Sequence, residues 1–356
     1  MMLNKNDFME VKTYHSYYTI PIDDKKVWKN IVKSAYAYDF HHTWYYHSLE
    51  TESEPFLFLL EHKDNFIALP LLKRKIEGTE YYDCTSVYGY AGPISNLPFS
   101  ELGAELIEEF KTSFETFLQS EKIVSVFSRL HPILNQDVLL ENLGGLHTTG
   151  KTVAMDLTVP HEEQVRNYRR AIRMKINQLR KKGFVVREAA CRTELKEFVR
   201  IYIENMIKVN ASESYFFDED YFANLLNSED FESKLLLAYY DNKITSGIIV
   251  TCSDNIMQTH LAATSNDFLH DAPMKLLFDE ASIVGREVGM KYLHLGGGVG
   301  GKEDSLFVFK SGFSNLFFDF KTWRYIANQP VYNQLVEERC KNREFNNVIF
   351  PLYRSH

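Results

Sequence analysis

Short apolar runs separated by polar turns predict β-strands in two parts of the chain. In the first part, apolar residues at 56–60 and 66–72 flank a polar turn at 62–65. In the second part, turns containing Asp and Asn separate three such runs, at 234–240, 244–252 and 256–263. Because consecutive short strands joined by tight turns pair antiparallel, each part is predicted to form an antiparallel meander.

Apolar residues at helical spacing predict amphipathic helices elsewhere. The expected helices lie around residues 27–35 and at 101–118, 194–209, 272–288 and 331–340. Further strands are expected at 123–127, 152–157, 292–295 and 348–353. Pro273 suits the first turn of the 272–288 helix, and Gly289 suits its end.

The two halves of the chain follow the same order of predicted elements. A strand, an Asp-Asn turn, two more strands, a long helix and a strand occur at 56–127 and again at 234–295. The order predicts two duplicated α/β domains, each with a mixed, mostly antiparallel sheet flanked by helices. It matches the topology of acyl-CoA N-acetyltransferases (GNAT). We expect domains at 1–155 and 156–356, with the C-terminal tail packing back on the first.

Length, charge and cysteine content narrow the class of protein. A chain of 356 residues is long enough for two cores. Its net charge of −8 predicts no general attraction to DNA or to anionic membranes. The four cysteines (84, 191, 252, 340) form no CxxC pair, and no apolar run could span a bilayer. These features predict a cytoplasmic protein with reduced thiols and no membrane insertion.

One segment departs from the acidic character of the chain. Residues 166–187 contain nine Lys or Arg and no acidic residue. Val165, Ile172, Ile176 and Leu179 form an apolar stripe, so one helix with a basic face is predicted, ending at Gly183. Two interpretations stay open: a solvated cationic face, or a site for a phosphate-rich ligand such as a nucleotide, coenzyme A or the end of a tRNA.

A glycine-rich stretch follows the predicted strand at 292–295. It contains Gly296-Gly297-Gly298, then Asp304-Ser305, and then an aromatic run around Lys310. Glycine amides could bind an anion or an oxyanion, and a lysine among aromatic residues is costly unless it has a role. A flexible loop with a core aromatic cluster and a snorkelling lysine is the equally weighted alternative.

Tyrosines and histidines supply further candidates. Tyr82, Tyr88 and Tyr90 precede a Gly92-Pro93 loop and suit either a binding groove or a tyrosine-rich sheet edge. An aromatic and acidic loop at 214–222 contains Tyr215. The histidines at 41, 42 and 47 fit no standard ligand spacing, so packing histidines are expected and no metal.

The chain resembles the FemAB-like transferases, which carry two tandem GNAT-like domains. The matching features, in order, are the segments 38–42, 68–72 and 82–93, the basic helix ending at 180–183, and the segments 295–298 and 304–310. The coiled-coil arm of the cell-wall members is absent. The Arg/Gln-x-x-Gly-x-Gly/Ala signature of acetyl-CoA enzymes is also absent, because residues 264–271 replace it.

The resemblance implies transfer of an acyl or aminoacyl group onto an amine. It places Phe309-Lys310 at the active channel and Gly92-Pro93 beside the acceptor site. It implies no tightly bound cofactor, with acyl-CoA or aminoacyl-tRNA as co-substrate. The implied partners are an amine acceptor, either a small molecule or a peptide, and a CoA donor or a tRNA end.

Acyl transfer needs a neutral amine, a bound donor and a stabilised oxyanion, which suggests roles for particular residues. The catalytic candidates are Lys310, as the cation near the oxyanion, and His294, Asp304 and Asp83. His260 is a further candidate base. The expected substrate-binding residues are Tyr88, Tyr90, Gly92, Arg173, Lys175, Arg180, Tyr215, His260, Gly296, Gly297, Gly298, Ser305 and Phe309.

Three functions compete at this point. The favoured one is an N-acyltransferase that uses acyl-CoA to modify an amino sugar, amino acid or peptide in bacterial envelope or polysaccharide synthesis. The second is an aminoacyl-tRNA-dependent transferase of the peptidoglycan-precursor type, which the basic helix favours and the net acidity opposes. The third is a non-catalytic binding module that has kept the GNAT fold.

Overall fold

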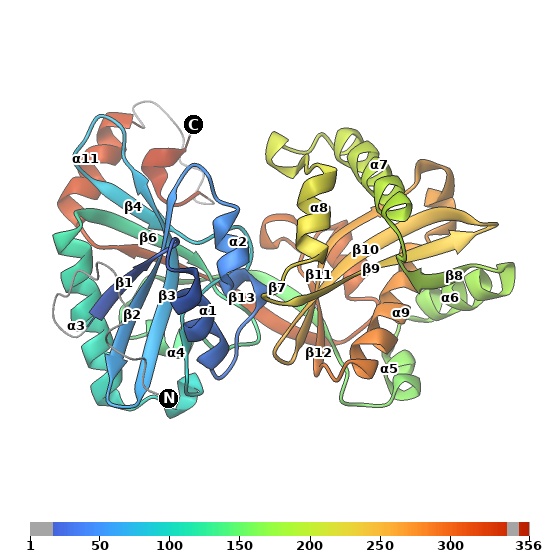
Figure 1. Ribbon diagram of the computed structural model, residues 1–356, viewed down its shortest axis with the longest axis horizontal. Coiled ribbons are helices and arrows are strands. Elements are labelled where there is room, and N and C mark those ends of the chain that lie inside the picture. The colour runs from blue at the N-terminus through green and yellow to red at the C-terminus, as the bar shows by residue number, and fades with distance from the viewer. Residues whose placement is uncertain (1–16, 340–348, 356) are drawn as a thin grey trace. The chain divides into compact units, whose positions relative to one another are not determined.

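The computed structural model describes residues 17–339 and 349–355 and divides the chain into two compact units (Figure 1). Unit 1 comprises Met1–Thr149 and Asp319–His356, and unit 2 comprises Gly150–Phe318. Each unit has its own set of strands and its own core.

Unit 1 contains a mixed sheet in the order β1-β2-β3-β4-β6-β13. Only β4 and β6 are parallel, and the short β5 pairs with β3. Its strands are β1 (Tyr17–Pro21), β2 (Glu54–His62), β3 (Asn65–Lys75), β4 (Tyr82–Thr85), β5 (Ile94–Ser95), β6 (Ile123–Arg129) and β13 (Leu316–Ile326). Its helices are α1 (Lys25–Ser34), α2 (Trp44–Ser48), α3 (Ala104–Ser120), α4 (Asp137–Leu140) and α11 (Gln329–Arg339).

Helices pack against both faces of the strands in unit 1, which explains why the middle of β2 and of β3 is apolar on both faces. Alternate residues such as Phe58 and Leu60 pack with Phe110 and Phe114 of α3. The intervening residues of β2 pack with Trp28 and neighbouring side chains of α1.

Unit 2 repeats this arrangement with the order β7-β12-β11-β10-β9-β8, in which only β11 and β12 are parallel. Its strands are β7 (Leu146–Asp156, beginning in unit 1), β8 (Val185–Glu188), β9 (Glu232–Tyr240), β10 (Lys243–Ser253), β11 (Ile256–Thr264) and β12 (Tyr292–Gly296). Its helices are α5 (His161–Asn167), α6 (Arg170–Lys182), α7 (Arg192–Lys208), α8 (Glu219–Leu226), α9 (Met274–Glu287) and α10 (Ser305–Lys310).

The core of unit 2 joins the basic helix to the sheet. Ile172, Ile176 and Leu179 of α6 pack with Leu277 of α9 and with β-strand residues such as Val250. The apolar stripe predicted from the sequence therefore faces this core, and it leaves the charged positions of α6 on the outside.

The predicted internal repeat is confirmed at the level of strand pairing. The series β1-β2-β3-β4-β6 and β8-β9-β10-β11-β12 have the same antiparallel and parallel partners in the same order. Asp241 and Asn242 both have positive φ, 50° and 58°, as a two-residue type I′ hairpin turn requires. In unit 1 the corresponding turn is formed by Lys63 and Asp64, because Asn65 already begins β3.

Two predicted elements differ from the structure. The single basic helix is two helices, because Tyr168 and Arg169 adopt extended ψ angles of 140° and 139° between α5 and α6. The helix α6 does end at Gly183, which has φ 95°. The strand expected at 348–353 is absent from residues 349–355, where Leu352–Arg354 form a 3-10 turn after Pro351, which has no N–H for a strand ladder.

Cys84, Cys191 and Cys252 are free thiols, and Cys340 lies outside the described residues. Within residues 17–339 and 349–355, no helix combines the length and the apolar character needed to cross a bilayer.

Candidate functional site

The parallel strands of unit 2 separate after a short paired segment. β11 and β12 pair only at Ile256–Tyr292, Met257–Leu293 and Gln258–His294. A hydrogen bond from Thr259 Oγ1 to the His294 carbonyl, 3.3 Å long, follows the last pair. Beyond it β11 continues along β10, whereas the end of β12 pairs with β7. The carboxyl ends of parallel strands are where open α/β sheets commonly bind ligands, so we take this divergence as the candidate site.

The glycine loop on the β12 side of the site is closely packed. Gly296 has φ 74°, which favours glycine. A Cβ atom on Gly297 would lie 2.6 Å from the Lys151 carbonyl oxygen, and one on Gly298 would lie 2.1 Å from the Lys302 carbonyl oxygen. Larger residues therefore have no room at these two positions.

Asp304 ties this loop to α10. Its carboxylate accepts hydrogen bonds from the backbone N–H of Val299, Leu306 and Phe307, each 3.0 Å long. These bonds to the ionised form lower the pKa of Asp304. Asp304 is therefore the N-cap of α10, and Ser305 is the exposed first residue of that helix.

Lys310 at the end of α10 points back to the glycine loop. Its ammonium donates a 2.8 Å hydrogen bond to the Gly297 carbonyl. Burial lowers the pKa of Lys310 to about 8, although Asp304 acts in the opposite direction. The neighbouring Phe309 ring packs against Phe278 and Phe313 and fixes the helix beside the core. The arrangement holds one partly desolvated cation at the end of β12.

His260 lies on the other side of the divergence. In the pairing of β10 with β11, Val250 faces Thr259 and Ile249 faces Leu261, so His260 is the extra residue of a β-bulge. Its Nε2 lies 3.3 Å from the hydroxyl of Tyr221. The Tyr221 ring stacks on Phe217 with centroids 4.0 Å apart. The predicted aromatic and acidic loop therefore reaches β11 through Tyr221.

Two other predicted residues of unit 2 have mainly structural contacts. His294 is fully buried, with Nδ1 2.5 Å from Gln258 Oε1. Tyr215, in the 214–222 loop, accepts a 3.0 Å hydrogen bond from the Tyr202 hydroxyl at its backbone carbonyl.

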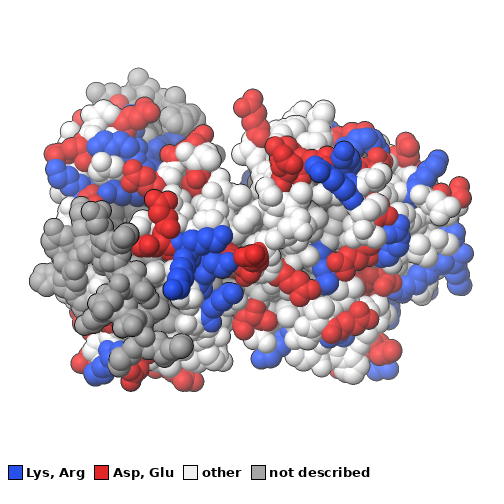
Figure 2. All heavy atoms as spheres, viewed as in Figure 1, with Lys and Arg blue, Asp and Glu red and all other residues white. Residues whose placement is uncertain are grey.

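The charges of α6 are partly used within unit 2. Arg180 donates to Asp279 at 2.8 Å and to Glu280 at 2.5 Å, both on α9. Lys182 pairs with Asp271 at 2.7 Å. Arg173 and Lys175 lie half-buried on the same helix. Figure 2 shows Lys and Arg gathered at the right-hand edge of the view, in the region of α6.

The remaining predicted residues belong to unit 1. Asp83 is fully buried and accepts hydrogen bonds from Arg74 (2.8 Å), Arg354 (2.6 Å) and the Tyr353 hydroxyl (3.1 Å). The carboxylate thereby anchors the C-terminal segment.

The tyrosine and glycine candidates of unit 1 lie on one loop. Tyr88 is 64% exposed, whereas the Tyr90 ring packs edge-on against the rings of His41 and His131. A Cβ atom on Gly92 would lie 2.3 Å from Gln136 Oε1, so this glycine is enclosed by its neighbours.

Removal of one partner of Asp83 is expected to destabilise unit 1. In Arg354→Ala the buried carboxylate keeps Arg74 but loses a charge-assisted hydrogen bond, which costs about 2 kcal/mol of unfolding free energy. Urea unfolding followed by tryptophan fluorescence measures this, since all three tryptophans (28, 44, 323) lie in unit 1. The control is Arg339→Ala on α11. The Arg339 guanidinium donates to a backbone carbonyl, that of Glu77, and not to a buried carboxylate. Equal stability of the two variants would contradict the anchoring role.

Several site residues were missed from the sequence. Tyr221 lies within the aromatic and acidic run but carries no distinguishing local signal. Gln258 and Thr259 are ordinary strand residues whose importance comes only from the place where β11 and β12 part.

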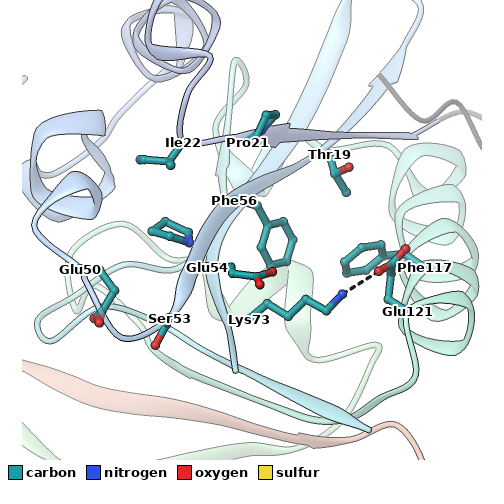
Figure 3. A pocket seen from close by; sticks show the side chains of 11 residues that line it. Thr19, Pro21, Ile22, Glu50, Ser53, Glu54, Phe56, Lys73, Phe117 and Glu121 are labelled. Atoms are coloured by element: carbon teal, nitrogen blue, oxygen red, sulfur yellow. Dashed lines mark hydrogen bonds and ion pairs between the residues drawn. The ribbon is translucent and has the colours of Figure 1, made fainter. Parts of the chain in front are cut away.

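A cavity of about 910 Å³ lies elsewhere in unit 1 (Figure 3). Phe56 and Phe117 line it, together with the ion pair between Lys73 and Glu121, whose Nζ–Oε2 distance is 2.7 Å. It contains none of the residues predicted from the sequence. Among the described residues, no group of three or more His, Cys, Asp or Glu side chains could hold a metal ion.

Comparison with solved structures identifies the fold. The chain is similar to FemX, with 16% sequence identity, 92% of this chain and 99% of that chain covered, and a TM-score of 0.68. It is also similar to the C-terminal domain (DUF2156) of a putative lysylphosphatidylglycerol synthetase from Agrobacterium fabrum, with 13% identity, 88% and 96% coverage, and a TM-score of 0.55. L-PGS from Bacillus licheniformis matches with 15% identity, 89% and 97% coverage, and a TM-score of 0.54.

The FemAB-like, GNAT-type fold expected from the sequence is therefore confirmed. No protein-family model matches the chain, and neither does any curated protein sequence.

Proposed function

We propose that this protein is an N-acyltransferase that moves an acyl group from an activated donor, with acyl-CoA favoured, onto an amine. The acceptor would be an amino sugar, amino acid or peptide used in bacterial envelope or polysaccharide synthesis, and the reaction would take place in the cytoplasm. The observation that carries the proposal is Lys310, bound to the Gly297 carbonyl where β11 and β12 diverge. The fold shared with FemX supports a transferase.

The proposed chemistry follows from this geometry. The neutral amine attacks the acyl carbonyl carbon, and the carbonyl oxygen becomes an oxyanion. The Lys310 ammonium stabilises that oxyanion. The C–S bond then breaks, the thiolate of the donor leaves and takes up a proton, and the acceptor nitrogen loses its proton to a base.

We assign the proton acceptor to His260. The Asp83 carboxylate is held by two arginines, Asp304 caps α10, and His294 is buried inside the sheet. Half-buried at the bulge of β11, His260 lies beside the divergence with its Nε2 next to the Tyr221 hydroxyl. A neutral imidazole there could accept the proton of the incoming amine directly or through Tyr221.

Arg173 and Lys175 are the proposed ligands for the phosphates of the donor. Arg180 also lies on α6, but its contacts with Asp279 and Glu280 hold it to α9. An anionic donor would then lie along α6, with its acyl end toward α10.

Thermal unfolding should reveal the donor. A donor that binds only the native state raises the melting temperature, by RT ln(1 + [L]/Kd) in free energy. We expect a rise with acetyl-CoA or a longer acyl-CoA, and a smaller one in Arg173→Ala. Lys291→Ala, which changes a lysine outside α6, is the control variant. If no acyl-CoA raises the melting temperature at millimolar concentration, the CoA-dependent assignment is wrong.

Aminoacyl-tRNA is the second candidate donor, and the basic surface of α6 is the observation that favours it. If only an aminoacyl-tRNA analogue raises the melting temperature, the donor is aminoacyl-tRNA. The bond that breaks is then the C–O bond of the aminoacyl ester and not the C–S bond of a thioester. Failure of both donors would leave a binding module with the same fold.

A further inference from the structure

The cavity of about 910 Å³ in unit 1 lies where β1 and β2 meet the end of α3 (Figure 3). Pro21 of β1 pairs with Phe56 of β2, and the Phe56 ring lies 5.5 Å from the Phe117 ring of α3, centre to centre. Both phenylalanines are buried and give the cavity an apolar floor. Its volume falls within the range of small-molecule sites, about 300–1,000 Å³.

Hydrogen bonds fix the rim of the cavity on the side of β1. The backbone N–H of Asp24 donates to the Pro21 carbonyl at 3.1 Å. The indole N–H of Trp44 donates to the Ile22 carbonyl at 2.7 Å. Pro21 and Ile22 both line the cavity. This wall is therefore in place before a ligand binds, so that less conformational freedom is lost on binding.

The lining of the cavity carries more negative than positive charge. Among the described residues that line it, the charged side chains are those of Glu50, Glu54, Glu121 and Lys73. The Lys73 ammonium donates to Glu121 at 2.7 Å and lies 4.2 Å from the centre of the Tyr82 ring. Glu50 accepts a 3.1 Å hydrogen bond from the backbone two residues on, which leaves its charge unbalanced. One carboxylate is thus neutralised within the protein, and two are left.

Glu54 is placed to use its charge on a ligand. Alternation along β2 puts its side chain on the same face as Phe56, and the strand pairing puts it opposite Lys73. Lys73 nevertheless bonds to Glu121, and the Glu54 carboxylate has no partner among the described residues. In Figure 3 this carboxylate lies next to the Phe56 ring. A negative group therefore adjoins the apolar floor.

We propose that this cavity binds an organic cation, a protonated amine attached to an aromatic or alkyl body. The ammonium pairs with Glu54, and Glu50 adds to the local negative charge. The body packs on Phe56 and Phe117.

This ligand is not the acceptor of the proposed reaction. An acceptor amine must be neutral to attack, whereas the carboxylates of the cavity favour the charged form of an amine. No residue assigned to the reaction lines the cavity. The proposed site is therefore independent of the proposed function.

The test uses the full chain and simple probes whose dissociation constants are measured by ligand-observed NMR. Phenethylamine and hexylamine combine the charge with an aromatic or an alkyl body, methylamine supplies the charge alone, and phenethyl alcohol supplies the uncharged ring. Phenylpropionate carries the opposite charge on the same kind of body. We expect phenethylamine or hexylamine to bind more tightly than the other three, and the tighter of the two identifies the body. Its affinity should fall as the salt concentration rises.

Two charge variants should act in opposite directions. Glu54→Gln should weaken amine binding about tenfold. Lys73→Met, which leaves Glu121 without its partner, should strengthen amine binding about threefold. Neither should change the affinity for phenethyl alcohol. Glu108→Gln, which changes an exposed carboxylate of α3 outside the cavity, is the matched control and should bind as the parent does. A cooperative thermal transition shows that each variant is folded.

Three results would overturn the proposal: equal amine affinity in Glu54→Gln and the parent, weaker amine binding in Lys73→Met, or phenylpropionate binding as tightly as phenethylamine. Its outcome is separable from that of the proposed function. If amines bind with this dependence on Glu54 while no acyl donor binds, the acyltransferase assignment falls and the cavity site stands. If donor and acceptor turn over while no amine binding depends on Glu54, the cavity site falls and the acyltransferase stands.

Discussion

Replacement of Lys310 by alanine is expected to lower kcat by roughly 10²–10³-fold, the cost of removing one preorganised group that stabilises an oxyanion. The ammonium lies 2.8 Å from the Gly297 carbonyl, so the fold holds it in place before substrate binds. Loss of a cation that acts only on the developing charge should lower kcat and kcat/KM together. Steady-state kinetics with the donor found by thermal unfolding measure both.

The dependence of the rate on pH tests whether Lys310 acts in its charged form. Because burial lowers the pKa of Lys310 to about 8, the lysine is charged below that pH and neutral above it. If the charged form stabilises the oxyanion, the rate must fall as the pH rises through about 8. Lys310→Arg keeps its charge over this range, so its lower rate should show no such fall.

The control for these experiments is Lys302→Ala, which removes an exposed lysine from the segment between the glycine loop and α10. It should retain the kcat and the pH profile of the parent. A rate that rises through pH 8 in the parent but not in Lys310→Arg would make Lys310 a base, and unchanged turnover in Lys310→Ala would remove it from the mechanism.

The same lowered pKa has a consequence for stability. The lysine loses its proton near pH 8 in the folded chain and near 10.5 when unfolded, so the unfolded chain binds more protons between these values. The contribution of Lys310 to the unfolding free energy therefore rises as the pH increases from 8 to 10.5. At neutral pH the buried charge of Lys310 lowers the unfolding free energy. Such a loss of stability at a functional site is common, because function often requires groups that destabilise the fold.

Local patterns were enough to predict most of the fold. These patterns involve only neighbouring residues: Asp-Asn pairs in turns, apolar runs of strand length, and apolar residues at helical spacing. The order of the predicted elements then identified the repeat. The prediction failed where contacts between residues far apart in the sequence determine the local structure. The segment 349–355 forms no strand because Tyr353 and Arg354 bind Asp83, some 270 residues earlier in the chain.

The candidate site was only partly predictable for the same reason. The glycines and Lys310 are close in sequence and were found together. Arg180 was expected to bind phosphate, and only the fold shows its partner Asp279 on α9. The divergence of β11 from β12 depends on the bulge at His260 and on the pairing of β12 with β7, neither of which leaves a local pattern.

Acid is expected to unfold unit 1 well above the pH at which exposed carboxylates are protonated. Burial lowers the pKa of His42 and of His131 to about 4, and that of His47 to about 3, from an ordinary value of 6.5. Each histidine is therefore neutral in the folded chain but takes up a proton on unfolding below pH 6.5. Asp39 adds to the effect at lower pH. Burial raises its pKa, but the charge and hydrogen bonds of His41 together with the charge of His131 outweigh burial, so the pKa of Asp39 lies below its usual range.

The sign and size follow from proton linkage. Between pH 6.5 and 4 the unfolded chain binds up to three more protons than the folded chain, so the unfolding free energy falls by up to about 4 kcal/mol per pH unit. A loss of this size over two pH units approaches the whole stability of an ordinary domain, about 5–15 kcal/mol. Urea unfolding at pH 7, 6 and 5 measures it, and tryptophan fluorescence reports unit 1 alone.

A variant without one of the three groups tests the cause. His131→Asn removes a buried imidazole, so the slope of stability against pH should fall by about a third, even if the variant is less stable at pH 7. The matched control, His147→Asn, changes an exposed histidine of the same unit and should leave the slope as it is. A flat pH dependence in the parent chain would mean that these histidines take up protons without unfolding, and that their buried surroundings tolerate charge.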